Sequence, residues 1–175
     1  MRVPCVMYWP GHIREGAVCE EITASIDFLP MLAALCGGKP GDLPIDGLDI
    51  SPLLFEDAPS PRDEIFYYCR RSLEGVRIGD WKLHISRNGK PQKLLYNLRE
   101  NPDEIDNLYE YHPDIVARLS ARLDEIRRDY GDAVANVPGG LVRPCARVEN
   151  PVPLSHPFSP DRPYMAPVYD RYEIG

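Results

Sequence analysis

The chain has 175 residues, 43% of them apolar, and a formal net charge of -7 at pH 7. This composition allows one domain with its own core, or one small domain with appendages. The negative charge argues against a nucleic-acid-binding surface, which normally shows clustered basic residues. No run of about 18 apolar residues is present, so no membrane span is expected. No signal peptide is visible, which says nothing about export if the natural N-terminus lies upstream. The five cysteines are widely spaced and predict buried or incidental thiols.

The first predicted element is a strand over residues 3–9. Between Pro4 and Pro10 the sequence CVMYW is apolar, with no polar residue alternating within it. Such a run is typical of a strand buried on both faces of a parallel sheet. Parallel partners arrive through crossovers of a dozen or so residues, and no second strand of this kind follows. We therefore expect this chain to be the end of a larger α/β protein.

A helix is predicted to begin between Asp27 and Leu29. Pro30 is tolerated only in the first turn of a helix, and Asp27 is the natural N-cap. Two glycines at 37–38 favour a left-handed stop. One face of this helix carries four apolar residues: Phe28, Met31, Leu32 and Leu35. We expect that face to pack on the predicted strand. A short helical turn is predicted to begin at Ser51.

From residue 64 the pattern changes to short antiparallel strands, predicted at 65–68, 75–78, 81–85 and 93–98. Gly79-Asp80 and Asn88-Gly89 supply turns between them. In the third strand, alternation places Trp81 and Leu83 on an apolar face and Lys82 and His84 on a wet face. A helix that opens at Pro113 and ends at Gly131 repeats apolar residues every three to four positions, so we expect it to cover the apolar face.

These changes predict three parts. Residues 1–62 form the end of a large α/β domain, and residues 63–131 form a small subdomain of antiparallel sheet and helix. Residues 132–175 hold eight of the nineteen prolines and form an irregular tail, either disordered or pinned to a surface by its apolar residues. The fold class is therefore α/β, and locally α+β.

The ordered motifs of the chain resemble the C-terminal third of the sulfatase family, within the alkaline-phosphatase-like superfamily. The resemblance runs from residue 1 to about residue 130 and rests on these segments: RVP at 2–4, YWPG at 8–11, IDFLP at 26–30, IDGLD at 45–49, SPLL at 51–54, FYY at 66–68, VRIGDWKL at 76–83 and LYNL at 95–98. The resemblance implies that Met1 is an internal methionine of a longer sulfatase.

For the complete protein, the resemblance implies sulfate-ester hydrolysis (a sulfuric ester hydrolase, arylsulfatase-like). The family's nucleophile is a formylglycine made from Cys or Ser in C/S-x-P-x-R, and a calcium ion binds the sulfate oxygens. No cysteine of this chain begins that motif, and the family's calcium ligands and catalytic lysines and histidines belong to segments before Arg2. We therefore expect no catalytic residue and no metal ligand here. Calcium and formylglycine are expected only in the complete enzyme, and this chain alone is expected to be inactive.

What the chain is expected to contribute is scaffold and substrate-rim loops. Candidate substrate-binding residues are Tyr68, Arg70, Arg71 and His84, on or beside the predicted hairpins. The planar fork of arginine suits a sulfate or carboxylate on a sugar. The expected partners are an N-terminal sulfatase domain and a sulfated small molecule or glycan. By family, the expected compartment is the periplasm, the lysosome or the outside of the cell.

Two other interpretations stay open. One is a stand-alone, non-enzymatic module that binds anionic glycans or a partner protein. An unpaired apolar strand at its edge would argue against that module, because such edges favour aggregation. The other is a phosphoesterase or phosphotransferase of the same superfamily, since the C-terminal segment says little about phosphate versus sulfate.

Overall fold

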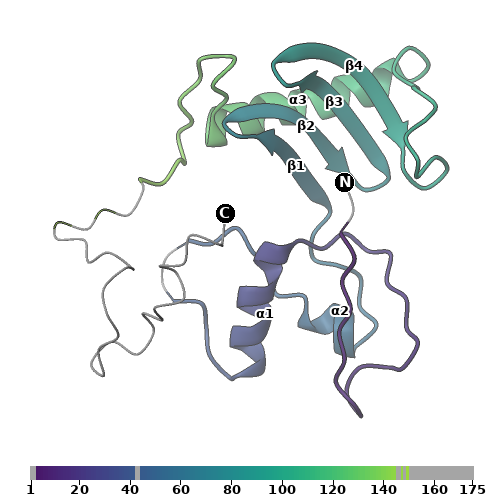
Figure 1. Ribbon diagram of the computed structural model, residues 1–175, viewed down its shortest axis with the longest axis vertical. Coiled ribbons are helices and arrows are strands. Elements are labelled where there is room, and N and C mark those ends of the chain that lie inside the picture. The colour runs from purple at the N-terminus through teal and green to yellow at the C-terminus, as the bar shows by residue number, and fades with distance from the viewer. Residues whose placement is uncertain (1–2, 42–43, 145–146, 148, 150–175) are drawn as a thin grey trace, which may run out of the picture. The chain divides into compact units, whose positions relative to one another are not determined.

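The computed structural model describes residues 3–41, 44–144, 147 and 149. The chain divides into two units, Met1–Val142 and Arg143–Gly175, and every described helix and strand belongs to the first (Figure 1). Most of the predicted tail, and the apolar residues expected to pin it, lie outside the described residues. Within the described ranges, no helix combines the length and apolarity that crossing a bilayer requires.

Four antiparallel strands form one sheet in the order β1-β2-β3-β4. Their bounds are Glu64–Cys69 for β1, Ser72–Ile78 for β2, Trp81–Arg87 for β3 and Lys90–Asn97 for β4. Asn88 and Gly89 join β3 to β4 with φ of 52° and 75°, the pair of left-handed residues that a two-residue hairpin turn needs. The predicted four-stranded antiparallel sheet is confirmed.

Helix α3, Pro113–Tyr130, packs on one face of this sheet (Figure 1). Leu119, Leu123 and Ile126 are at most 1% exposed and lie on one face of the helix at the predicted spacing. The sheet contributes four buried residues to the same core: Leu73, Val76, Leu83 and Leu95. Burying each of these side chains contributes about 1.5–3 kcal/mol, so this core is a major source of stability for the sheet and α3. The predicted covering helix is confirmed.

The opposite face of the sheet is not simply wet, as the alternation predicted. Lys82 is only 4% exposed, because Glu104, in the loop after β4, covers it. The Lys82 Nζ donates to both Glu104 carboxylate oxygens, at 2.6 and 2.8 Å. It also lies 4.9 Å from the centre of the Tyr67 ring, a favourable position for a cation. The prediction of a solvated Lys82 was therefore wrong, since a long-range ion pair buries the side chain.

Helices α1, Phe28–Leu35, and α2, Ser51–Phe55, precede the sheet. Asp27 begins α1 as predicted, after a single 3-10 turn at Ser25–Asp27, but its side chain does not cap that helix. Its carboxylate instead accepts from the backbone N–H groups of Ala24 and Leu48 and from the Arg62 guanidinium. Burial raises the pKa of this carboxyl, and these bonds, led by Arg62, outweigh that effect, so the pKa lies below its ordinary value.

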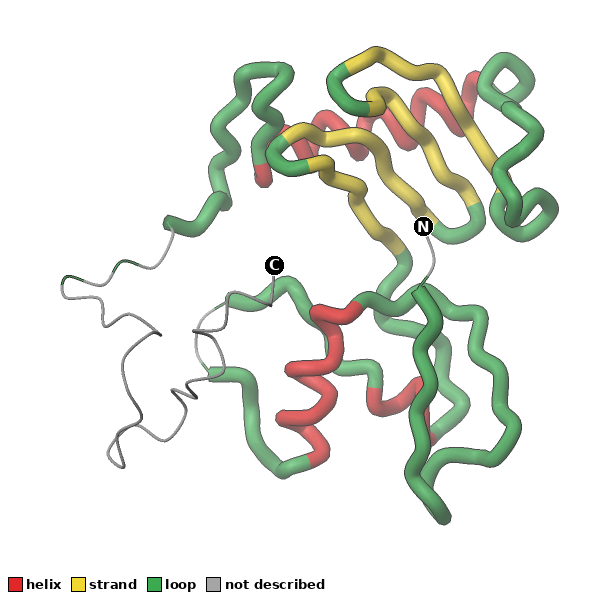
Figure 2. The backbone as a smooth tube through the Cα atoms, in the orientation of Figure 1, coloured by secondary structure: helices red, strands yellow, loops and turns green. Residues whose placement is uncertain are grey.

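No strand forms over residues 3–9, which are drawn as loop in Figure 2. Val6 is 92% exposed and Tyr8 is 83% exposed. A strand needs hydrogen-bonded neighbours, and none of the four described strands pairs with this segment. The predicted packing of α1 on this strand therefore has no counterpart, and Leu29 and Leu32 of α1 remain 59% and 53% exposed.

Candidate functional site

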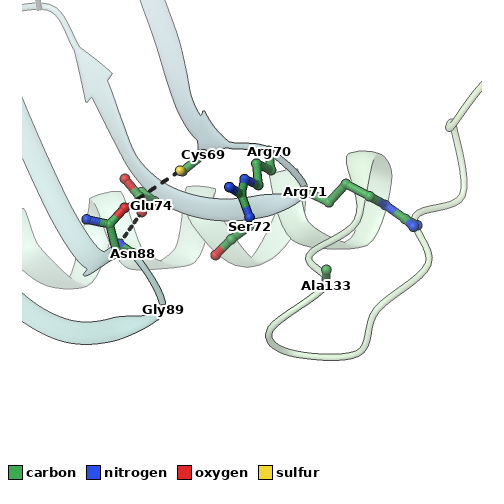
Figure 3. A pocket seen from close by; sticks show the side chains of 8 residues that line it. All are labelled: Cys69, Arg70, Arg71, Ser72, Glu74, Asn88, Gly89 and Ala133. Carbon is green, nitrogen blue, oxygen red and sulfur yellow. Dashed lines mark hydrogen bonds between the residues drawn. The ribbon is translucent and has the colours of Figure 1, made fainter.

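An open pocket of about 500 Å³ lies at the end of the sheet where the β1–β2 and β3–β4 turns meet the loop after α3 (Figure 3). It is lined by Cys69, Arg70, Arg71, Ser72, Glu74, Asn88, Gly89 and Ala133. Alternate turns of an antiparallel sheet in this strand order lie at the same end of the sheet, so the β1–β2 and β3–β4 turns are brought together. It contains two of the four predicted substrate-binding residues.

Arg70 and Arg71 are the two residues of the β1–β2 turn. Arg70 has a φ of 58°, in the left-handed region that L-residues rarely occupy. The Arg71 carbonyl accepts from the Ala133 N–H at 2.8 Å, which fixes the turn to the loop after α3. In Figure 3 the Arg70 side chain bends over the turn beside Ser72, and the Arg71 side chain extends away from it. Both side chains are exposed.

The remaining polar groups of the pocket are mostly engaged with one another. Glu74 accepts from the backbone N–H of Asn88 at 2.6 Å, and the Cys69 thiol donates to the Asn88 side-chain oxygen at 3.9 Å. The buried Ser72 hydroxyl has no hydrogen-bond partner in the described part of the chain. The lining thus holds two guanidinium groups against one carboxylate, and that carboxylate already accepts a backbone bond.

Tyr68 does not lie in this pocket. Its ring packs against the core between the sheet and α3, and its hydroxyl donates to the Gly131 carbonyl at 2.8 Å. Burial raises the pKa of Tyr68, and the nearby Asp132 carboxylate raises it further. A phenol that is neutral and committed to a backbone carbonyl ties β1 to the end of α3, so Tyr68 has a structural role in this arrangement.

His84 lies on the other face of the sheet, away from α3. Its ring stacks on Tyr67 with the ring centres 5.7 Å apart and the planes at 28°. Burial lowers the pKa of His84, and the Lys82 charge lowers it further, so the imidazole is neutral at pH 7. The four predicted residues are therefore divided among three environments, and only Arg70 and Arg71 share one site.

Sequence reasoning missed Glu74 and Asn88 as pocket residues. The signal for Asn88 was present, because Asn88-Gly89 was predicted as a hairpin turn. What was lacking was the inference that this turn and the β1–β2 turn lie at the same end of the antiparallel sheet. Counting strands from the predicted turns would have brought the two together.

The family's cofactors find no fitting residues in the described chain. Within the described ranges, no group of three or more His, Cys, Asp or Glu side chains is placed to hold a metal ion. Carboxylates that could serve are engaged by cations instead, as Glu64 is by Arg122 and Glu104 by Lys82. The C/S-x-P-x-R motif of a formylglycine precursor does not occur in the sequence. No catalytic step is therefore assigned to residues of this chain through calcium or formylglycine.

Comparison with known proteins identifies the family. The family model described as N-sulphoglucosamine sulphohydrolase, C-terminal, matches residues 1–129. The chain therefore belongs to the sulfatase family, of which it carries the C-terminal portion. Arylsulfatase A of Bos taurus is 35% identical over 133 residues, which cover 62% of this chain and 26% of that protein. Steryl-sulfatase of Mus musculus is 43% identical over 79 residues, which cover 44% of this chain and 13% of that protein.

A solved structure supports the fold. This structure is of a protein in complex with its substrate D-glucosamine-2-N,6-O-disulfate. Superposed on the present chain, it gives a TM-score of 0.55 at 22% sequence identity. The superposition covers 77% of this chain and 29% of that one. The chain spans about a quarter of the length of the arylsulfatase A proteins it matches, 26% in each case.

Proposed function

We propose that this chain acts as the C-terminal part of a sulfate-ester hydrolase. In this proposal an N-terminal sulfatase domain holds the catalytic groups, and the present residues supply scaffold and substrate-rim loops. The observation that carries the proposal is the match of residues 1–129 to a sulfatase C-terminal model, together with relatives that are sulfatases over the same region.

The uncovered apolar residues before the sheet support a larger domain. Val6 and Tyr8 are more than 80% exposed, and Leu29 and Leu32 more than half exposed. Burying such a side chain contributes about 1.5–3 kcal/mol, so a covering domain would gain several kcal/mol from these four alone. We infer that the N-terminal sulfatase domain covers them and that residues 3–9 pair as a strand within its sheet.

The rim function falls to the β1–β2 turn. Arg70 and Arg71 would face an anionic substrate, and Tyr68 would hold their turn in place through its bond to Gly131. His84 lies outside the pocket, on the sheet face opposite α3. It would contact a substrate only if that substrate extended from the pocket onto this face. In the complete enzyme, replacing Arg70 and Arg71 by Gln is expected to raise KM with kcat little changed, because these residues bind rather than react.

Calcium and formylglycine belong to the proposed N-terminal domain. They would supply the charge that stabilises the sulfate oxygens and the nucleophile, respectively. We propose that the present chain holds neither group and is inactive alone. The sulfated substrate is inferred only as a class, a sulfated small molecule or glycan.

The test is expression of the gene with its upstream codons, read in frame, beside the 175-residue chain alone. The longer product is expected to hydrolyse 4-nitrophenyl sulfate, and replacement of the Cys or Ser of its C/S-x-P-x-R motif should abolish turnover. The short chain should show none. Hydrolysis by the short chain would contradict the division of roles. Hydrolysis of 4-nitrophenyl phosphate alone would favour the phosphoesterase interpretation instead.

A second candidate function is binding of anionic glycans without catalysis. Arg70 and Arg71 make no ion pair within the described residues, which favours this function, since their guanidinium groups offer anion contacts that need no neighbouring domain. It would become the leading interpretation if the upstream codons held a stop signal and no sulfatase motif.

A further inference from the structure

The two arginines of the β1–β2 turn differ from the structural arginines of this protein. Arg62 is bound to Asp27, and Arg122 is bound to Glu64 through two nitrogens. Arg70 and Arg71 make no ion pair with any described residue. The two residues are neighbours in the sequence, so an anion bound beside the turn would be attracted by two positive charges.

The turn that carries them is strained and held. The left-handed φ of Arg70 is a conformation for which hairpin turns normally use Gly, Asn or Asp. Such strain persists where the surroundings impose it and is frequent at binding sites. Here the Arg71 carbonyl is bound to Ala133, and the Tyr68 hydroxyl, just before the turn, is bound to Gly131. The turn therefore presents its arginines from a fixed backbone.

The pocket beside the turn has the size and charge of a small-ligand site. Its volume of about 500 Å³ lies within the usual range for such sites. The only carboxylate in the lining, Glu74, accepts from the Asn88 N–H, which offsets part of its charge. The described lining residues thus carry two positive charges and one partly offset negative charge, and this balance favours an anion.

We propose that this pocket binds the carboxylate or sulfate group of an acidic sugar, with Arg70 as its first contact. Guanidinium matches both oxyanions through parallel N–H···O bonds. Arg70 already bends over the turn, while the exposed Arg71 extends away (Figure 3) and would rotate in to complete the contact. The choice of a sugar as carrier rests on the proposed function, whereas the recognition of an anion rests on the pocket itself.

The test is a binding titration of the 175-residue chain with glucuronate, glucose 6-sulfate and glucose. Amide chemical shifts of Arg70, Asn88 and Gly89 report occupancy. Both anionic sugars are expected to bind and neutral glucose is not, and the tighter of the two identifies the group that the pocket prefers. Replacing Arg70 and Arg71 together by Gln is expected to weaken binding about tenfold, the loss of one or two charge-assisted hydrogen bonds.

A matched control variant removes two positive charges from the surface of α3, away from the pocket. Arg118 and Arg128 are exposed residues of α3, and replacing both by Gln should change the Kd less than twofold. Glu74→Gln keeps an acceptor for the Asn88 N–H but removes its charge, so it should tighten binding and gives a gain that misfolding cannot imitate.

Three results would overturn the proposal: no amide shift with either anionic sugar, equal binding of glucose, or equal loss in the α3 control. None of them depends on turnover. Failure of the longer product to hydrolyse a sulfate ester would overturn the proposed function but not this binding. Failure of the short chain to bind either anionic sugar would overturn the pocket proposal, while hydrolysis of 4-nitrophenyl sulfate by the longer product would still support the proposed function.

Discussion

Removing Glu104 and removing Lys82 both break the ion pair between these residues, but the two substitutions are expected to destabilise the protein by different amounts. The Lys82 side chain is 5% exposed, whereas that of Glu104 is 28% exposed. Glu104→Gln leaves a buried ammonium with no counter-charge beside the Tyr67 ring. Lys82→Met fills the same space with an apolar chain and leaves a carboxylate that water reaches. Removal of the acid should therefore destabilise the protein more than removal of the base.

The expected magnitudes follow from this difference in burial. Leaving one buried charge unpaired costs about 3–5 kcal/mol. The amide oxygen introduced by Glu104→Gln still accepts one bond, which places that variant at about 3 kcal/mol. Replacing a whole buried ion pair by apolar residues is often close to neutral. Lys82→Met removes the buried member and leaves a Glu104 carboxylate that water reaches, so it should cost only about 1 kcal/mol. The double variant removes both charges and should resemble Lys82→Met.

Urea unfolding followed by tryptophan fluorescence measures these differences. The chain has two tryptophans, and Trp9→Phe in every variant leaves Trp81, which packs against the core of the sheet, as the only reporter. If Lys82→Met costs as much free energy of unfolding as Glu104→Gln, burial does not control the energetics of this pair and the reasoning is refuted.

The same pair predicts a pH dependence. Burial raises the pKa of Glu104, but the bond and charge of Lys82 lower it more, so its pKa in the folded protein lies below the ordinary 4.5. A carboxyl whose pKa is lowered by folding stabilises the folded state at pH values above its pKa in the unfolded protein. That contribution is lost as the pH falls through its pKa in the folded protein. The free energy of unfolding should therefore fall between pH 6 and pH values below about 4. This fall should be smaller in the Lys82→Met variant than in the unchanged protein, and urea unfolding at both pH values measures it.

Two further predictions concern other buried positions. Asp27→Ala should cost about 3–5 kcal/mol, because it leaves the Arg62 guanidinium without its counter-charge. In the unchanged protein the Leu48 amide donates to Asp27, so this amide should exchange its hydrogen faster in the variant. Unchanged exchange would contradict the prediction. Gly75→Ala should cost about 2 kcal/mol or more in urea unfolding, because its Cβ would lie 2.4 Å from the Leu83 carbonyl oxygen; Gly38→Ala, whose nearest atom is at 3.6 Å, is the control, and equal costs would refute the steric argument.

The sheet and its covering helix could be predicted because their signals are local. Asn88-Gly89 specifies a hairpin turn through its left-handed conformation, and Pro113 and Gly131 mark the ends of α3 through their backbone constraints. The apolar spacing of α3 then requires a partner surface, which the adjacent strands provide. None of these inferences needs a contact between distant residues.

The site could be predicted only in part because its geometry depends on register. Tyr68 and His84 belong to different strands, and whether they share a face depends on the pairing of each strand with β2. A register irregularity at Tyr67/Tyr68 changes that relation and cannot be read from alternation. The Lys82–Glu104 and Asp27–Arg62 pairs join residues 22 and 35 positions apart, and no periodic pattern encodes such a partner.

The order β1-β2-β3-β4 also has a consequence for folding kinetics. Every strand pairs with its neighbour in sequence, and each connection between strands is a turn of two residues. Short loops close at little entropic cost, and domains rich in local contacts fold faster than those built from distant strand pairs. The hairpins can form as soon as their residues leave the ribosome, and α3 then closes the core. This subdomain is therefore expected to reach its native pairing without waiting for the slower, long-range pairing that a parallel sheet requires.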